Sequence, residues 1–317
     1  MKSKLKIVFM GTPDFSVPSL KEINKIHNVI RVYTQPPRAF GRGLKEKISP
    51  IHKFANENNL DVSFPSNFRN NKEVDELKEL NPDFIVVVAY GLILPGLILQ
   101  IPKFLSLNGH ASKLPRWRGA APIHRALEEG DKITAVEAMI MEETLDTGSI
   151  VFSKDILISD NDTFKSLHDR LSKSMPKVLL KAIDSISNNN FSAIQQNNSG
   201  ITYAKKIDPS EKFLNWKQNY TSIKNKLRAF TPWPGIWVTH NGNKLRIHSI
   251  NKYLFNKDYS NFKPGQIVGF SDRKSPIVIT NDYKLFEINQ IQRQGGIKMN
   301  SAEFIKGYNM QIGDIFK

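Results

Sequence analysis

The sequence of 317 residues contains no cysteine. This absence excludes disulfide bonds, zinc sites with thiolate ligands, iron–sulfur clusters and a cysteine nucleophile. Long hydrophobic runs are also missing: the longest, Phe84–Leu94, is interrupted by Gly91 and stops at Pro95, so it is too short to cross a bilayer. The apolar run Leu5–Met10 is too short for the core of a signal peptide. We therefore expect a cytoplasmic protein.

Acidic residues are fewer than basic ones. The chain has 45 Lys and Arg against 30 Asp and Glu, which gives a net charge of +15. The excess is uneven, because residues 1–206 carry 28 basic and 22 acidic side chains, whereas residues 207–317 carry 17 and 8. A domain with such a surplus attracts polyanions, and nucleic acid above all. A lysine-rich composition caused by an AT-rich genome is the alternative, but it does not explain the asymmetry.

The length suggests two domains, at about 150 residues each. In the first half, short apolar runs alternate with helical patterns, as expected for strands and helices in turn. The predicted strands are Leu5–Met10, Val29–Tyr33 and Phe84–Ala89, and the predicted helices are Val17–Ile26, Pro50–Asn58 (capped by Ser49) and Lys72–Leu80. The unbroken run Phe84–Ala89 is typical of a central parallel strand covered on both faces. We predict an α/β domain with a mostly parallel, Rossmann-like open sheet that binds ligands beyond the carboxyl ends of its strands.

The character of the sequence changes after the polar, asparagine-rich stretch Ser187–Gly200, which we interpret as a linker. A helix capped by Thr221 is predicted to run through Phe230. Short strand-like runs follow at Ile236–Thr239, Lys244–Ile250, Gln266–Phe270, Pro276–Thr280 and Lys284–Ile291. Five short strands separated by turns indicate a small β-barrel of the OB type. The predicted domains are therefore residues 1–188 and 207–317, joined by residues 189–206.

The segment Gly11–Phe15 follows the first predicted strand, where a dinucleotide-binding fold carries its G-x-G-x-x-G fingerprint. The segment does not contain the G-x-G-x-x-G pattern. Pro13 also removes a backbone N–H donor that a pyrophosphate would need. The segment therefore argues against a nicotinamide enzyme. An ordinary strand-to-helix turn and a loop that faces the substrate are both compatible with it.

The connection Thr34–Lys47 is long for a compact domain, and unstructured loops of this length tend to be functional. Gly41 and Gly43 stand on either side of Arg42, and three further basic residues lie nearby: Arg38, Lys45 and Lys47. A basic loop flanked by glycines can close over phosphates. A merely solvated loop is the alternative.

Asn108 and His110 are two residues apart at the end of a predicted strand, so their side chains point the same way. An asparagine amide can donate to a carbonyl oxygen, and a histidine can exchange a proton near neutral pH. Asp146, on the tight turn Leu145–Gly148, offers a carboxylate that can orient the imidazole. An Asn-x-His pair alone is a weak signal, and a structural histidine is the usual alternative. The aspartate makes a catalytic trio the stronger hypothesis.

Several segments together resemble the methionyl-tRNA formyltransferases, a family of 10-formyltetrahydrofolate-dependent enzymes. The matching segments are Gly11–Phe15, Ala89–Gly91, Asn108-x-His110, Leu114–Ile123, Leu145–Gly148, Thr202–Ala204, Lys226–Phe230 and Pro232–Gly235. The resemblance covers nearly the whole chain. All formyltransferases and hydrolases that depend on this folate share the Asn-x-His and Asp set. The run Pro115–Pro122 and the Trp-Pro-Gly region are more specific and distinguish the methionyl-tRNA formyltransferases among these enzymes.

The resemblance implies transfer of the formyl group of 10-formyltetrahydrofolate to the α-amino group of methionine on initiator tRNA. The product, N-formylmethionyl-tRNA, serves translation initiation. Asn108 and His110 would donate to the oxyanion that forms on the formyl oxygen, and Asp146 would hold His110 and help to manage the proton that the amine loses. No metal or electron-carrying cofactor is needed.

By the same resemblance, the folate would be bound by Ser112, Lys113, Leu114 and Pro115. The Tyr90–Leu94 loop would lie against the pterin, and Arg42 would insert at the acceptor end of the tRNA. The basic domain, residues 207–317, would hold the acceptor arm by its phosphates. We expect a monomer.

The sequence departs from the family pattern at three positions. The family usually has a branched apolar residue where Gly109 stands, glycine where Ala111 stands and leucine where Lys113 stands. Gly109 is expected to loosen the strand between the two catalytic residues. Ala111 would be strained if the backbone there has a positive φ.

Two other functions stay open. A formyltransferase that acts on a small amine, such as a purine ribotide or a nucleotide sugar, would share the trio but would not need a basic second domain. A nucleic-acid-binding protein with a degenerate catalytic half is the other, and the intact trio argues against it. Trp233 and Trp237 are candidates for base stacking, although packing in the core is the more common role.

Overall fold

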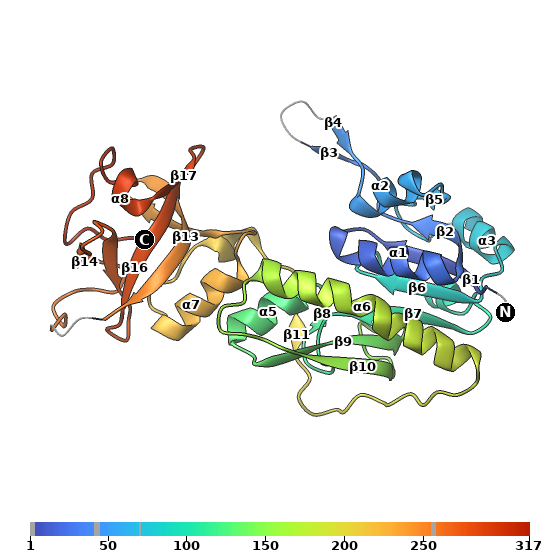
Figure 1. Cartoon of the computed structure of the whole chain (residues 1–317). Coiled ribbons are helices and arrows are strands. Elements are labelled where there is room, and N and C mark those ends of the chain that lie inside the picture. The colour runs from blue at the N-terminus through green and yellow to red at the C-terminus, as the bar shows by residue number, and fades with distance from the viewer. Residues whose placement is uncertain (1–3, 41–44, 70, 255–257) are drawn as a thin grey trace. The chain divides into compact units, whose positions relative to one another are not determined.

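The computed structural model describes residues 4–40, 45–69, 71–254 and 258–317. Arg42, the predicted substrate-binding residue, lies outside the described residues. The chain divides into two compact units (Figure 1). The first consists of Met1–Pro122, Ile133–Leu157 and His168–Lys205, and the second of Ile123–Lys132, Ile158–Leu167 and Lys206–Lys317. Two short segments that precede residue 168 thus belong to the second unit.

A sheet whose described residues form seven strands lies at the centre of the first unit, in the order β10-β9-β7-β6-β1-β2-β5. The strands are β1 (Lys6–Gly11), β2 (Asn28–Tyr33), β5 (Val62–Ser63), β6 (Phe84–Val88), β7 (Leu105–His110), β9 (Ile133–Ile140) and β10 (Ile150–Leu157). The strands from β7 to β5 in this order run parallel, whereas β9 and β10 are antiparallel to their neighbours. The prediction of an α/β domain with a mostly parallel sheet is confirmed.

The helices of this unit are α1 (Val17–Ile26), α2 (Pro50–Glu57), α3 (Asn71–Glu79), α4 (Gly96–Leu99) and most of α6 (Phe164–Ser187). Ser49 caps α2 as predicted, because its hydroxyl oxygen accepts a hydrogen bond from the His52 backbone amide at 3.0 Å. The long connection after β2 was predicted to be unstructured, which is wrong in part. Its two ends pair as the antiparallel strands β3 (Arg38–Phe40) and β4 (Lys45–Lys47).

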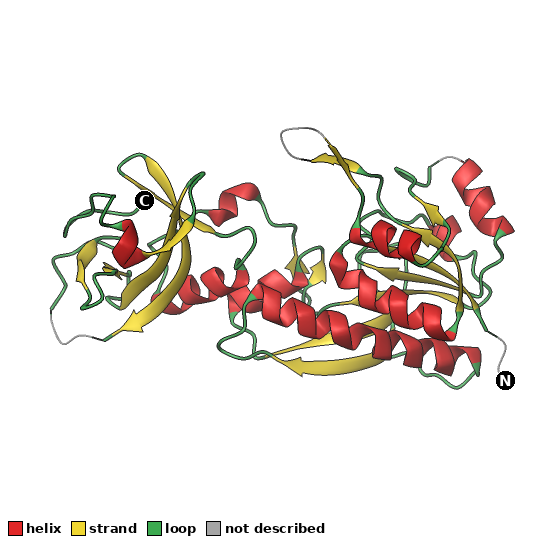
Figure 2. Ribbon diagram, turned by 45° about the horizontal axis from the view of Figure 1, so that its top comes forward, coloured by secondary structure: helices red, strands yellow, loops and turns green. Residues whose placement is uncertain are grey.

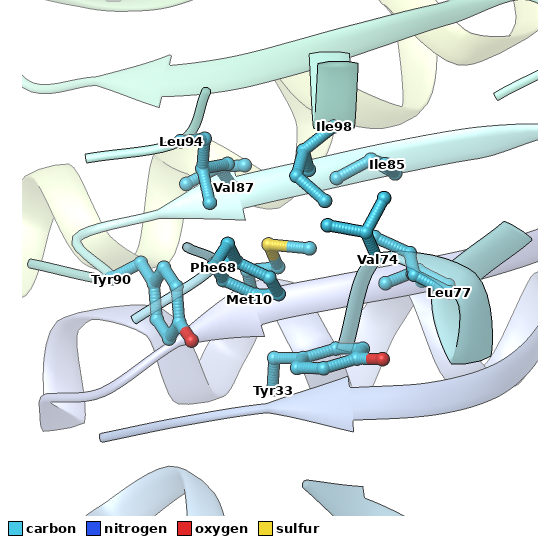
Figure 3. Close-up of a cluster of buried hydrophobic side chains, with 11 residues drawn as sticks. Met10, Tyr33, Phe68, Val74, Leu77, Ile85, Val87, Tyr90, Leu94 and Ile98 are labelled. Carbon is cyan, nitrogen blue, oxygen red and sulfur yellow. The ribbon is translucent and has the colours of Figure 1, made fainter. Parts of the chain in front are cut away.

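Residues of β6 point alternately to the two faces of the sheet. On one face, Ile85 and Val87 pack in a buried cluster with residues of β1, α3 and α4, as Figure 3 shows. The other members of that cluster are Val8, Met10, Tyr33, Phe68, Val74, Leu77, Tyr90, Leu94 and Ile98. On the opposite face, Val88 lies close to Met175 of α6. The continuous apolar run of β6 is therefore buried on both sides, as its composition predicts.

Antiparallel strands form most of the second unit. Their order is β12-β13-β16-β15-β14, with β17 paired to β16. The strands are β12 (Ile236–His240), β13 (Asn243–Tyr253), β14 (Ile267–Phe270), β15 (Pro276–Ile279), β16 (Leu285–Arg293) and β17 (Lys298–Asn300). The five predicted strands are all present, and β17 is additional. Figure 2 shows the strong curvature of the longer strands.

Helix α7 (Tyr220–Ala229) precedes these strands. Its cap is Asn219, whose side-chain oxygen accepts a hydrogen bond from the Ser222 amide at 2.9 Å, and not the predicted Thr221. Both residue types can cap a helix, but asparagine ranks above threonine. Trp233, for which core packing was the favoured role, is 60% exposed.

The asparagine-rich stretch after α6 forms neither helix nor strand until β11 (Tyr203–Ala204). There it pairs in parallel with β8 (Arg118–Gly119), so this part of the predicted linker is attached to the first unit. No helix in the described part of the chain is long and apolar enough to span a bilayer.

Candidate active site

Asn108 and His110 lie at the carboxyl end of β7. This strand pairs with parallel β6 on one side and antiparallel β9 on the other, so its register is fixed from both sides. Asp146 comes from the turn between β9 and β10, with a backbone φ of +52°. The structure brings the three predicted residues together at one end of the sheet.

The Asp146 carboxylate is the centre of the site. Its Oδ1 accepts a hydrogen bond from the Asn108 side-chain amide at 3.2 Å, and its Oδ2 accepts one from the Gly119 backbone amide at 2.7 Å. The same Oδ2 lies 3.7 Å from Nδ1 of His110, which is beyond hydrogen-bond distance. The His110 and Asp146 side chains are only 6% and 11% exposed, so solvent screens their interaction little.

The His110 imidazole is fixed by the backbone of a neighbouring loop. Its Nε2 lies 3.1 Å from the carbonyl oxygen of Trp117. A carbonyl oxygen only accepts hydrogen bonds, so we assign the proton of the neutral ring to Nε2 and the lone pair to Nδ1. Nδ1 is the nitrogen that faces Asp146. The contacts of the Trp117 and Gly119 backbone groups could not be predicted, because backbone groups leave no pattern in a sequence.

The predicted folate-binding residues form a tight loop between β7 and β8. The Ser112 hydroxyl donates to the Arg116 carbonyl oxygen at 2.7 Å, and the Trp117 backbone has a φ of +66°. Ser112 and Leu114 are buried, Pro115 is half-buried and Lys113 is exposed. The Lys113 ammonium lies 2.6 Å from Asp155, so its side chain is paired at the surface of the protein. The structure brings these residues to the same end of the sheet as the trio, and their role toward folate stays a prediction.

Glu137 of β9 holds this loop in place through hydrogen bonds. Its Oε2 accepts a hydrogen bond from the Leu114 backbone amide at 3.0 Å, and its Oε1 accepts one from the Ser153 hydroxyl at 2.8 Å. Burial raises the pKa of Glu137 from 4.5 to about 7, against the effect of these two hydrogen bonds. The register of the sheet places Glu137 opposite His110. A carboxyl group that titrates near neutral pH therefore supports the predicted folate loop.

The loop after β6 is held in place by two side-chain hydrogen bonds. The Tyr90 carbonyl oxygen accepts hydrogen bonds from the Thr12 hydroxyl at 2.8 Å and the Gln35 side-chain amide at 3.0 Å. Thr12 belongs to the segment Gly11–Phe15, which therefore acts as a brace for this loop. Among the described residues, the buried Tyr90 hydroxyl has no hydrogen-bond partner, whereas Ile93 is 89% exposed.

Gly109 does not leave a gap between the two site residues. A Cβ atom on Gly109 would lie 2.8 Å from Sδ of Met175 and 3.2 Å from a methyl group of Val88. The methionine side chain of α6 therefore occupies the space that a larger residue would take. Ala111 does not have a positive φ, so the strain considered for it does not arise.

Residues 5–183 match the family model described as "Formyl transferase", and residues 206–309 match "Formyl transferase, C-terminal domain". The methionyl-tRNA formyltransferase of Parvibaculum lavamentivorans is 38% identical over 313 residues, which cover 98% of this chain and 99% of that protein. That of Legionella pneumophila strain Paris is 39% identical and covers 97% of both chains.

The chain belongs to the formyl transferase family. The predicted resemblance to methionyl-tRNA formyltransferases is thereby confirmed over nearly the whole length. Solved structures share the fold of this formyltransferase at lower identity. An N-formyltransferase from Helicobacter canadensis in complex with folinic acid and dTDP-3-aminofucose is 21% identical, with a TM-score of 0.62 over 90% of this chain and 98% of that one. HypX from Aquifex aeolicus in complex with tetrahydrofolic acid is 16% identical, with a TM-score of 0.62 over 99% of this chain and 51% of that one.

The raised pKa of Glu137 predicts a pH dependence of the stability of this formyltransferase. The folded state keeps the Glu137 proton up to about pH 7, whereas the unfolded state releases it near 4.5. Between these values the folded state binds more protons, so this group lowers the free energy of unfolding as pH rises, by up to about 3 kcal/mol. Urea unfolding at pH 5 and pH 8 should therefore show that Glu137→Gln gains stability relative to the unmodified chain at the higher pH.

Glu79→Gln is the control for this measurement, because Glu79 lies exposed on α3. A constant difference between Glu137→Gln and the unmodified chain at both pH values would contradict the assignment.

Proposed function

We propose that this chain transfers the formyl group of 10-formyltetrahydrofolate to the α-amino group of methionine esterified to initiator tRNA. The observation that carries the proposal is the similarity to methionyl-tRNA formyltransferases over both halves of the chain. The folate supplies an activated formyl group on a nitrogen that can leave. The chain supplies the groups that orient the amine, stabilise charge on the formyl oxygen and move one proton.

The site has features that suit a folate. The exposed side chains Ile93 and Leu97, at 89% and 67%, offer an apolar surface of the kind that a flat aromatic ring system covers. The Tyr90 hydroxyl in the same loop is buried and has no hydrogen-bond partner in the described part of the chain. The loop that contains Ser112, Lys113, Leu114 and Pro115 would form the facing side. These residues hold the folate in the proposal.

Asn108 stabilises the negative charge that develops on the formyl oxygen. Its Nδ2 carries two hydrogens, of which Asp146 Oδ1 accepts one. The second is available to the oxyanion. One such donor typically lowers the barrier by about 3 to 4 kcal/mol, or a factor of about 100 to 1,000 in rate. Because Asp146 holds the amide before substrate binds, no reorientation is needed during the reaction.

His110 moves the proton. When the amine nitrogen bonds to the formyl carbon, Nδ1 of His110 accepts the proton that the amine loses, because Nε2 already donates to Trp117. The resulting imidazolium lies 3.7 Å from the Asp146 carboxylate, which stabilises its charge. The imidazolium donates to the oxyanion, and its proton then passes to the folate nitrogen as the bond from that nitrogen to the formyl carbon breaks. The imidazole is thus restored to its starting state.

The second unit binds the acceptor arm of the tRNA in this proposal. We assign it an OB-like barrel and place the domains at residues 1–188 and 207–317, with a linker over 189–206. Exposed basic side chains follow its strands, namely Lys244, Lys252, Arg293 and Lys298. Burial, together with the positive charges of Arg246 and Lys298, lowers the pKa of His248, as expected where basic groups lie close together.

Three further assignments complete the proposal. Arg42 inserts at the acceptor end of the tRNA. The exposed indole of Trp233 is suited to stack on a base, because it is 60% accessible. The protein acts as a monomer in the cytoplasm.

Formylation of charged initiator tRNA tests the proposal against the small-amine alternative. The protein is mixed with 10-formyltetrahydrofolate and either methionyl initiator tRNA or free methionine, and formylmethionine is measured after hydrolysis of the ester. We expect product from the charged tRNA and little from the free amino acid, because only the tRNA contacts the basic unit. Equal turnover of free methionine would favour an enzyme that acts on small amines.

The salt dependence of tRNA binding tests the role of the second unit. With about four to six phosphate contacts, log affinity should fall with log salt at a slope of roughly −3 to −5. The double variant Lys252→Gln/Lys298→Gln removes two exposed charges and should make the slope shallower by about 2.

The matched control Lys72→Gln/Lys78→Gln removes two exposed charges from α3 in the first unit and should leave the slope unchanged. Identical slopes for the two variants would mean that the basic excess is only compositional.

A further inference from the structure

The segment that follows α6 is polar, yet it is attached to the first unit at three places. Ile194 pairs with Ile150 at the start of β10, and both backbone hydrogen bonds of this pair measure 2.8 Å. Gln196 is buried, whereas its neighbours Gln195 and Asn197 are exposed. Further along, β11 pairs with β8. Figure 1 traces this segment from the end of α6 to β11. It is therefore a strap along the unit that contains the site.

The Gln196 side chain forms hydrogen bonds with two segments of the site. Its amide nitrogen donates to the backbone carbonyl oxygens of Asp146 at 2.9 Å and Gly148 at 2.8 Å. Its Oε1 accepts from the Arg118 guanidinium, at 3.1 Å from Nε and 2.8 Å from Nη2. Gln196 and Arg118 are 8% and 6% exposed, so both depend on these contacts for their polar groups.

Both partners of Gln196 are next to the residues of the proposed catalytic trio. The turn that it holds carries the Asp146 side chain, whose backbone has a left-handed conformation that an aspartate tolerates but does not prefer. Arg118 lies between Trp117, whose carbonyl oxygen accepts from His110, and Gly119, whose amide donates to Asp146. The strap adds two bonds here, because Thr202 accepts from the amides of Trp117 at 2.9 Å and Arg118 at 2.9 Å.

We propose that Gln196 is a positioning residue for formyl transfer, which sets the Asp146 carboxylate against Asn108 and His110. The inference rests on the proposed function. Gln196 itself touches no reacting atom. It joins the turn of Asp146 to the strand of Arg118, so the distance between the carboxylate and the imidazole depends on it.

The effect on rate follows from the geometry that Gln196 controls. Loss of a group that orients a catalytic residue typically lowers activity by about 10- to 100-fold. We expect Gln196→Ala to lower the single-turnover rate of formyl transfer to charged initiator tRNA by this factor. The KM values for tRNA and 10-formyltetrahydrofolate should change less than about 2-fold, because Gln196 does not face either substrate in the proposal. The exposed neighbour gives the matched control, Gln195→Ala, which should keep the full rate.

A double-mutant cycle separates positioning from general structural support. If Gln196 acts through Asp146, Gln196→Ala should cost less than about 2-fold in an Asp146→Asn background. A purely structural role would multiply the two losses. Gln196→Glu is a second variant, which keeps an acceptor for Arg118 and removes the amide donor to the turn. It should lose rate like Gln196→Ala when both variants are assayed at a temperature at which circular dichroism shows them to be folded.

The outcomes are distinguishable. No formylation by the unmodified chain would remove the proposed function itself. A functional unmodified chain with a slow Asp146→Asn variant, but with Gln196→Ala and Gln196→Glu at more than half of the normal rate, would overturn this inference alone. So would full multiplication of the losses in the double variant.

Discussion

The other groups of the site are arranged around the carboxylate of Asp146, which is only 11% exposed. A carboxylate removed from water needs hydrogen-bond donors, and here the Asn108 amide and the Gly119 backbone amide supply them. The same carboxylate faces Nδ1 of His110. One group thus fixes the amide that we propose to stabilise the oxyanion and faces the imidazole that we propose to take the proton. Asn108 and His110 lie on the same face of β7, because side chains two residues apart along a strand point the same way.

The surroundings of this carboxylate are held by the central sheet and by the strap after α6. The central sheet fixes β7 through its pairing with β6 and β9. Glu137 holds the predicted folate loop through the Leu114 amide, and the strap after α6 holds the turn of Asp146 through Gln196. Met175 of α6 fills the space beside Gly109, so the strand between the two site residues stays packed. The departure from the family pattern at this position is therefore compatible with an ordered site.

Most of the fold was predictable from local patterns. Continuous apolar runs such as Phe84–Val88 and strand-like runs in the second half marked the strands, and the Asn-x-His spacing with Asp146 marked the centre of the site. Contacts made by backbone groups were not predictable, as the Trp117 and Gly119 bonds show. Gln196 was missed because a buried glutamine in an asparagine-rich stretch has the same composition as a solvated linker. Its contacts are visible only once distant segments are placed side by side.

The single-turnover rate of the Asp146→Asn variant tests the central claim most directly. Asparagine keeps the size of the side chain but loses the charge and one acceptor. We predict that formyl transfer to charged initiator tRNA is slower by about 100-fold or more, with the affinity for tRNA nearly unchanged. A variant that binds tRNA normally and keeps more than half of the rate would contradict the account.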